Sequence, residues 1–155
     1  MKFIVEQIAL CPPHPKVAIE LLTAMGLAEW ARDHVTAAGF VFGENTESEA
    51  DLAFNYDATS AKPLELEVLH YTAGNNWMKS HGPSVSHLGM HCTADELEEW
   101  RSFFFARGIG VAQEVFTKEH TNPVISGKRW YTYAIFDTRP ILGVDIKFIV
   151  RRDSL

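Results

Sequence analysis

The feature that most constrains the fold is a pattern of secondary structure that the chain repeats: a strand, a helix and three further strands. In the first copy, residues 2–10 (KFIVEQIAL) predict the strand, and a cluster of three prolines ends it. The helix begins at Pro15, which suits a first turn, and ends at Gly26, which suits the C-terminal cap. Its apolar residues, at positions 17, 18, 21, 22 and 25, have helical spacing. We predict three strands at about 28–36, at 39–43 or 50–57 beside a polar loop (ENTESEAD), and at 63–71.

The second copy follows a polar break at 72–83. Residues 84–92 (SVSHLGMHC) predict a strand, and Thr93 with Glu96 forms the spacing of a capping box for the next helix. Apolar residues at positions 97, 100, 103 and 104 predict the buried face of that helix, which ends at Gly108. Further strands are predicted at about 109–117, 129–137 and 143–150.

The two copies align at a constant offset. Gln7 and His87 lie 80 positions apart (87 − 7), in the two opening strands, and so do Glu67 and Lys147 (147 − 67), in the two closing strands. We therefore expect a single α+β domain, residues 1–155, built from two βαβββ modules, about 1–72 and about 84–151. Their curved mixed β-sheets would surround a shared cavity, with the helices outside.

Composition excludes several classes of protein. The 155 residues suit one domain, and 14 basic against 20 acidic residues (net charge −6) argue against a nucleic-acid partner. No apolar run reaches the roughly 18 residues of a membrane span, so no membrane partner is expected. The polar pair Glu6–Gln7 interrupts any signal peptide, and two cysteines without CxxC spacing form no disulfide framework, which predicts a cytoplasmic protein. No GxGxxG, P-loop or GxSxG motif is present.

Four short motifs, in order, cover nearly the whole chain: VEQIAL (5–10), LELEVLHY (64–71), SHLGMHC (86–92) and GVDIKFIV (143–150). With the paired modules, they make the chain resemble the vicinal oxygen chelate superfamily, which includes glyoxalase I, bleomycin- and fosfomycin-resistance proteins and extradiol dioxygenases. The resemblance implies a homodimer and a divalent metal (Zn, Ni, Co, Mn or Fe) held by Gln7, Glu67 and His87. Amide oxygen, carboxylate and imidazole suit such ions.

The fourth ligand position departs from the family, because Lys147 stands where a carboxylate is expected. Asp145, two residues earlier on the same strand face, is the alternative carboxylate, so Asp145 and Lys147 are the candidate proton-transfer groups. Glu65 and His91 share strand faces with Glu67 and His87, and are expected to line the pocket.

Three interpretations of this cluster stay open. A metal is bound and Lys147 stands aside; or Lys147 takes the place of the metal by pairing with Glu67; or the residues are polar members of a half-exposed sheet. The corresponding functions are a metal-dependent lyase or isomerase acting on a small vicinal-oxygen substrate, and a metal-free protein that sequesters a small aromatic or anionic ligand.

Two segments outside these strands also bear on the pocket. The loop KEHTNPVISGKRWYTY (118–133) contains His120 and Arg129. Arg129 could clamp an anionic ligand, although a solvated hairpin loop is an equal alternative. Trp77 lies in the break between the copies, either over the cavity or packed between the halves, and packing is expected.

Overall fold

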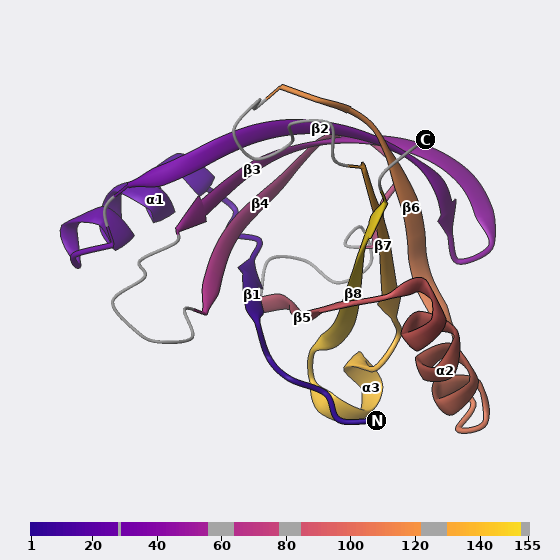
Figure 1. The fold of residues 1–155 in the computed structure, drawn as a ribbon. Coiled ribbons are helices and arrows are strands. Elements are labelled where there is room, and N and C mark those ends of the chain that lie inside the picture. Colours follow the sequence, from indigo (N-terminus) through magenta and orange to yellow (C-terminus); the bar gives the residue numbers. More distant parts are fainter. Residues whose placement is uncertain (28, 56–63, 78–84, 122–129, 153–155) are drawn as a thin grey trace.

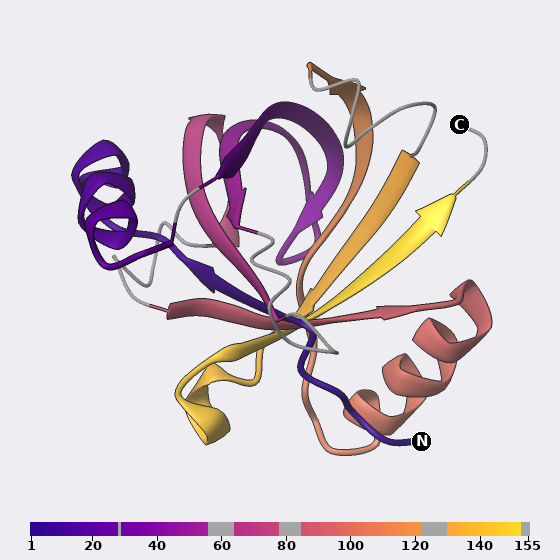
Figure 2. The same cartoon turned by 60° about the vertical axis from the view of Figure 1, so that its left-hand side comes forward.

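The computed structural model describes residues 1–27, 29–55, 64–77, 85–121 and 130–152, and it shows eight strands closed into one mixed barrel (Figure 1). The strand order around the barrel is β1-β4-β3-β2-β6-β7-β8-β5. In chain order the elements are β1 (Gln7–Leu10), α1 (Pro15–Ala24), β2 (Trp30–Val41), β3 (Glu44–Asn55), β4 (Glu65–Gly74), β5 (Val85–Cys92), α2 (Ala94–Phe105), β6 (Val111–His120), β7 (Trp130–Phe136), α3 (Arg139–Leu142) and β8 (Asp145–Arg152). The expected α+β architecture with curved mixed sheet is confirmed at this level, and the turned view shows α1 and α2 on the outside of the strands (Figure 2).

The polar segment ENTESEAD, predicted as a loop, lies instead in β3. The strands predicted at about 28–36 and 39–43 overlap one long strand, β2. The loop prediction failed because Ser48 and Ala50 turn inward while Glu47, Glu49 and Asp51, which alternate with them, face solvent. Such an alternation is that of a half-buried strand. β2 and β3 are joined by Phe42 and Gly43, which both have positive φ, as tight hairpin turns require.

The two long helices differ in how well the sequence predicts their buried faces. In α1 the expected apolar stripe is wrong, because Val17 and Leu21 are each 61% exposed and Ile19 is the buried residue. In α2 the predicted capping box of Thr93 and Glu96 is confirmed. The helix α3, which the sequence analysis did not predict, is a single turn that ends at Gly143 with φ of 73°.

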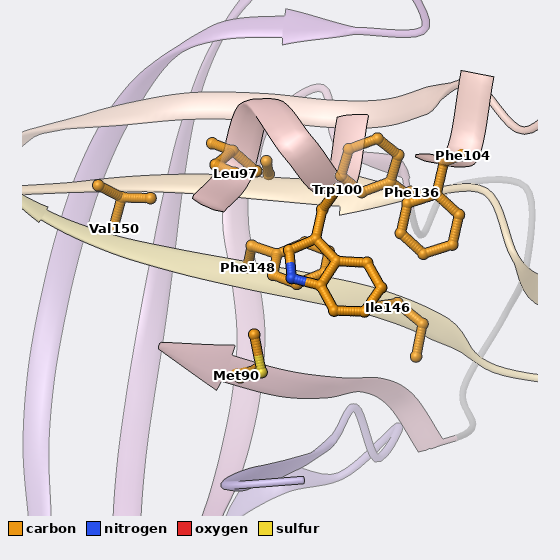
Figure 3. Close-up of a cluster of buried hydrophobic side chains, with 9 residues drawn as sticks. Met90, Leu97, Trp100, Phe104, Phe136, Ile146, Phe148 and Val150 are labelled. Carbon is orange, nitrogen blue, oxygen red and sulfur yellow. The ribbon is translucent and has the colours of Figure 1, made fainter. Parts of the chain in front are cut away.

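Helix α2 packs on the barrel through an aromatic cluster (Figure 3). The rings of Trp100 and Phe148 stack with centroids 5.3 Å apart, and those of Phe104 and Phe136 stack at 4.6 Å. This burial fixes β8 against α2, and β8 carries Asp145 and Lys147. None of the helices in the described part of the chain has the length and apolar composition that a membrane-spanning helix needs.

Four strands that lie far apart in the sequence are consecutive neighbours in the barrel: β4, β1, β5 and β8. β1 pairs in parallel with β4 and antiparallel with β5, and β5 pairs in parallel with β8. In this register Ala9 lies opposite both Glu67 and His87, and Gly89 lies opposite both Gln7 and Lys147. Since side chains alternate between the two faces of a strand, Gln7, Glu67, His87 and Lys147 all share one face.

Candidate functional site

The four side chains that the 80-residue offset singled out meet in one buried polar cluster. His87 Nε2 lies 2.9 Å from Gln7 Oε1 and 3.2 Å from Glu67 Oε2. Lys147 Nζ lies 3.2 Å from Gln7 Oε1, 3.3 Å from His87 Nε2 and 3.6 Å from Glu67 Oε2. All four residues are more than nine-tenths buried. The amine of Lys147 is therefore within 3.6 Å of every atom that was expected to ligate a metal.

A glycine in β5 makes room for this arrangement. A Cβ added to Gly89 would lie 3.0 Å from Gln7 Oε1 and 3.1 Å from Gln7 Cβ, tighter than ordinary contacts. The Gln7 amide is also oriented from its other end, because its Nε2 donates a hydrogen bond to Glu65 Oε1. Its carbonyl oxygen consequently faces His87 and Lys147. A glycine inside a strand often marks such a close approach, so Gly89 was a detectable signal.

The charge state of the cluster follows from burial and from the close ion pair. Burial opposes ionisation of Glu67, but the ammonium of Lys147 and the adjacent His87 outweigh it and hold the pKa of Glu67 below its ordinary value. Burial, reinforced by Lys147, lowers the pKa of His87 to about 4. Glu67 is therefore a carboxylate and His87 a neutral imidazole at neutral pH.

The neutral imidazole of His87 has polar partners at both ring nitrogens. Its Nδ1 lies 3.0 Å from Ser86 Oγ, and that hydroxyl donates to the backbone carbonyl oxygen of Ala9 at 3.2 Å. Because a hydroxyl has one proton, Ser86 then accepts from Nδ1–H. His87 Nε2 keeps its lone pair, which accepts from the Lys147 ammonium at 3.3 Å.

One carboxylate oxygen in the cluster lacks a hydrogen bond. Glu67 Oε2 is buried and has no hydrogen-bond partner among the described residues, since neither His87 nor Lys147 approaches it with hydrogen-bond geometry. Lys147 also lies over the ring of Tyr133, with Nζ 4.8 Å from the ring centroid. A cation over an aromatic face is favourable, so Tyr133 helps to hold the ammonium in the barrel.

Glu67, His87 and Lys147 line one end of a cavity of about 50 Å³ inside the barrel. Its other walls are mainly apolar and come from β2, β3, β4, β6 and β7. They include Val35, Ala37, Ala50, Leu52, Leu69, Val115 and Ile135, with the polar residues Ser48, Tyr71, Gln113 and Tyr133 between them. A cavity of this size has room for a few water molecules or for a small organic group.

Asp145, the other candidate proton-transfer group, is fully buried but its carboxylate is engaged elsewhere. It accepts hydrogen bonds from the Trp77 indole N–H at 2.8 Å, and from the backbone N–H of Arg139 at 3.0 Å. The Arg139 guanidinium also contacts it, with Nε 3.3 Å from Oδ2. Asp145 thus anchors Trp77. The Trp77 side chain is fully buried and packs edge-on against Tyr71, in agreement with the expectation that it packs in the interior.

The remaining predicted pocket residues are placed differently. Glu65 accepts a hydrogen bond from the Gln7 amide, on the side of Gln7 that faces away from His87 and Lys147. His91 lies at the surface, where its side chain is 54% exposed and pairs with Glu6 at 3.1 Å, so the expectation that it lines the cavity does not match the structure. The side chain of His120 and the whole of Arg129 lie outside the described residues.

Several residues at the site were missed by sequence reasoning. Tyr133 and Gln113 come from β7 and β6, whose pairing with the site strands is set by tertiary structure. Alternation in WYTYAIF could have placed Tyr133 and Ile135 on one inward face. Ser86 carries no signal of its own, because its role depends on the ring orientation of His87.

The donor set can be tested against the metal that the resemblance implies. Ligand atoms bound at roughly 2.0–2.3 Å around one ion are themselves roughly 2.8–3.8 Å apart. His87 Nε2 has this spacing to both Gln7 Oε1, at 2.9 Å, and Glu67 Oε2, at 3.2 Å. The fourth group is an ammonium, which repels a cation and offers no lone pair. Among the described residues no three His, Cys, Asp or Glu side chains are grouped to hold a metal ion. With Lys147 protonated, the four residues do not fit a divalent ion.

In comparisons with known proteins, neither a family model nor a curated protein matches the chain.

Proposed function

We propose that this chain is a glyoxalase-like protein whose barrel cavity binds a small organic molecule without a metal, the ammonium of Lys147 taking the place of the ion. The observation that carries the proposal is the position of Lys147 Nζ, 3.2 to 3.6 Å from Gln7 Oε1, His87 Nε2 and Glu67 Oε2. The single positive charge of Lys147 then balances the carboxylate of Glu67. It would also orient the bound molecule, as a divalent ion does in the superfamily.

The strand order supports membership of the superfamily. Residues of the first proposed module form the run β1-β4-β3-β2, and those of the second form β5-β8-β7-β6 in the opposite direction around the barrel. In the first run β1 pairs in parallel with β4, and in the second β5 pairs in parallel with β8. Two modules, about 1–72 and about 84–151, account for this correspondence. Assembly as a homodimer is part of the same proposal, and sedimentation velocity tests it.

The energetics of the buried pair favour retention of Lys147 in the cluster. A buried carboxylate without a partner is strongly disfavoured, and the lysine reduces that cost because it is close to Glu67 and hydrogen-bonded to Gln7 and His87. A divalent ion brought to the same three atoms would lie next to the ammonium, where repulsion in a low-dielectric interior is large. Metal binding therefore requires loss of the lysine proton or displacement of its side chain.

The cavity walls indicate the type of ligand. One end is charged and hydrogen-bonding, whereas most of the remaining wall is aliphatic. A small molecule with one polar end and an apolar body fits this division, as is usual for ligand sites.

A second candidate function is a metal-dependent lyase or isomerase acting on a small vicinal-oxygen substrate. The spacing of the Gln7, Glu67 and His87 ligand atoms favours it, as does Glu67 Oε2, which has no hydrogen-bond partner among the described residues. A divalent metal would supply Lewis-acid polarisation of the substrate oxygens, and these three residues would hold it.

Binding by metal-stripped protein separates the two candidates. The protein is treated with a chelator and screened with small organic fragments by protein-observed NMR, with and without added Zn²⁺. We expect fragments to shift the signals of cavity residues equally in both conditions. An Ala37→Leu variant, which fills the cavity from β2, is the control and should abolish the shifts. Shifts that appear only after addition of metal would contradict the proposal and favour the second candidate.

A further inference from the structure

We infer that the ligand of the cavity is a small neutral molecule with a hydroxyl group that donates a hydrogen bond to Glu67 Oε2. This inference rests on the proposed function, because it specifies the ligand class of the metal-free cavity. It comes from one feature of the cluster, a carboxylate oxygen that receives no hydrogen bond from the described residues.

Glu67 Oε2 is an acceptor that requires a donor. The Glu67 side chain is 2% exposed, lines the cavity, and its Oε2 has no hydrogen-bond partner among the described residues. A buried polar atom without a partner costs free energy, and such an atom in a folded protein calls for an explanation such as a bound molecule. A donor from inside the cavity would satisfy it.

The protein donors nearest to Glu67 Oε2 are directed elsewhere. His87 Nε2 accepts from Lys147 and therefore has no proton to donate to Glu67. Lys147 Nζ has hydrogen-bond partners in Gln7 Oε1 and His87 Nε2, while Glu67 Oε2 is farther, at 3.6 Å. A hydroxyl oxygen next to both residues would donate to Glu67 and accept from Lys147. No other common functional group of one heavy atom does both without carrying charge.

The charge balance favours a neutral ligand. The carboxylate of Glu67 and the ammonium of Lys147 already compensate each other. An anionic ligand would be desolvated beside Glu67, and a cationic ligand beside Lys147, each at a high cost. Water is neutral and can donate a hydrogen bond to Glu67 Oε2. It makes no favourable contact, however, with the aliphatic side chains of Val35, Leu69 and Val115 in the same cavity. A short alcohol satisfies both the carboxylate and the apolar wall.

Four probes with the same number of heavy atoms test the inference: propan-2-ol, acetone, acetate and isopropylammonium. Each is titrated into chelator-treated protein, and the methyl signals of Val35, Leu69 and Val115 and the indole N–H of Trp77 are followed by NMR. The Trp77 ring is a reporter because its centroid lies 6.0 Å from that of His87. A hydrogen bond to a charged group predicts that propan-2-ol binds about tenfold or more tightly than each of the other three probes.

Glu67→Gln is the matched variant, because its amide offers both a donor and an acceptor in nearly the same shape. We expect the preference for propan-2-ol over acetone to fall to about twofold in this variant. Tighter binding of acetone, acetate or isopropylammonium to the wild type would overturn the inference while leaving metal-free binding intact. Absence of any shift would show that the cavity takes only water, and would also overturn it. Shifts that require added Zn²⁺ would instead identify failure of the proposed function.

Discussion

Lys147 Nζ lies 3.6 Å from Glu67 Oε2, and the two side chains are 8% and 2% exposed. They come from β8 and β4, strands that do not pair with each other but are brought within reach by β1 and β5. A buried pair of opposite charges is much more sensitive to loss of one partner than to loss of both. That asymmetry provides the first test of the cluster.

Lys147→Met should destabilise the fold by about 3–5 kcal/mol, because it leaves the buried carboxylate of Glu67 uncompensated. Adding Glu67→Gln to it should recover a large part of that loss. The free energy of unfolding in urea for both single variants and the double variant gives the coupling energy. Lys118→Met is the control, since Lys118 forms an exposed pair with Glu47 at 2.8 Å, and it should cost less than about 1 kcal/mol. Additive effects of Lys147→Met and Glu67→Gln would contradict a direct pair.

Stability should rise between pH 4 and pH 6.5 because of His87. The pKa of His87 is about 4 in the folded protein, against 6.5 for a histidine in the unfolded chain. Between these two pH values the unfolded chain binds the proton and the native protein does not. The contribution is on the order of 3 kcal/mol. The lowered pKa of Glu67 acts in a lower window: its stabilisation is present above the ordinary value of 4.5 and is lost as the pH falls further.

Urea unfolding across this pH range measures the effect, and His87→Gln should remove the His87 part of the slope. His34→Gln, at a histidine whose side chain is 37% exposed, is the matched control. An unchanged slope in His87→Gln would show that the imidazole is already protonated in the native state or that other groups dominate.

Gly89→Ala should disturb the site through Gln7. The added Cβ would lie 3.0 Å from Gln7 Oε1, so the amide must move away from His87 and Lys147. We expect a destabilisation of about 1–3 kcal/mol, as for other overpacked positions, and a shift of the His87 imidazole signals in NMR spectra. At Gly110 an added Cβ would meet nothing within 4 Å, so Gly110→Ala serves as control. Equal effects of the two substitutions would argue against the contact.

Asp145 should act in the fold through Trp77 and Arg139. Asp145→Asn weakens both the indole hydrogen bond and the buried ion pair, and should cost about 2–4 kcal/mol. The near-ultraviolet circular dichroism of Trp77 should change with it. Asp51→Asn, at a 60% exposed carboxylate paired with His34, is expected to cost less than about 1 kcal/mol. An Asp145→Asn variant with unchanged stability would contradict this structural role. It would favour the proton-transfer role that the position of Asp145 first suggested.

The sequence predicted the parts of the fold that depend on local pattern. The capping box at Thr93 and the buried face of α2 could be predicted because helix termini and spacing are local properties. The β3 segment was missed because its outward acidic residues resemble a loop, although Ser48 and Ala50 alternate inward. The α1 stripe was wrong because the buried face of a helix depends on where the barrel contacts it. That contact is a property of the tertiary structure and is not visible in the local spacing of apolar residues.

The candidate site was predictable in its members and not in its geometry. The constant offset identified Gln7, Glu67, His87 and Lys147, and the register of β4, β1, β5 and β8 places all four on one face. It could not place the Lys147 amine, whose position depends on side-chain torsions and on Tyr133 from β7. His91 shares a strand face with His87, but its backbone N–H bonds to Glu6 near the surface, beyond the paired length of β1.

The metal content of Lys147→Glu beside that of the wild type tests the central claim most directly. Both proteins are exposed to Zn²⁺, Ni²⁺, Co²⁺, Mn²⁺ or Fe²⁺, dialysed, and measured by elemental analysis. If the lysine ammonium occupies the place of the ion, the wild type retains less than about a tenth of an equivalent. The variant, which presents a fourth ligand of the right type, then retains about one equivalent. About one equivalent in the wild type, removed by His87→Ala, would contradict the account.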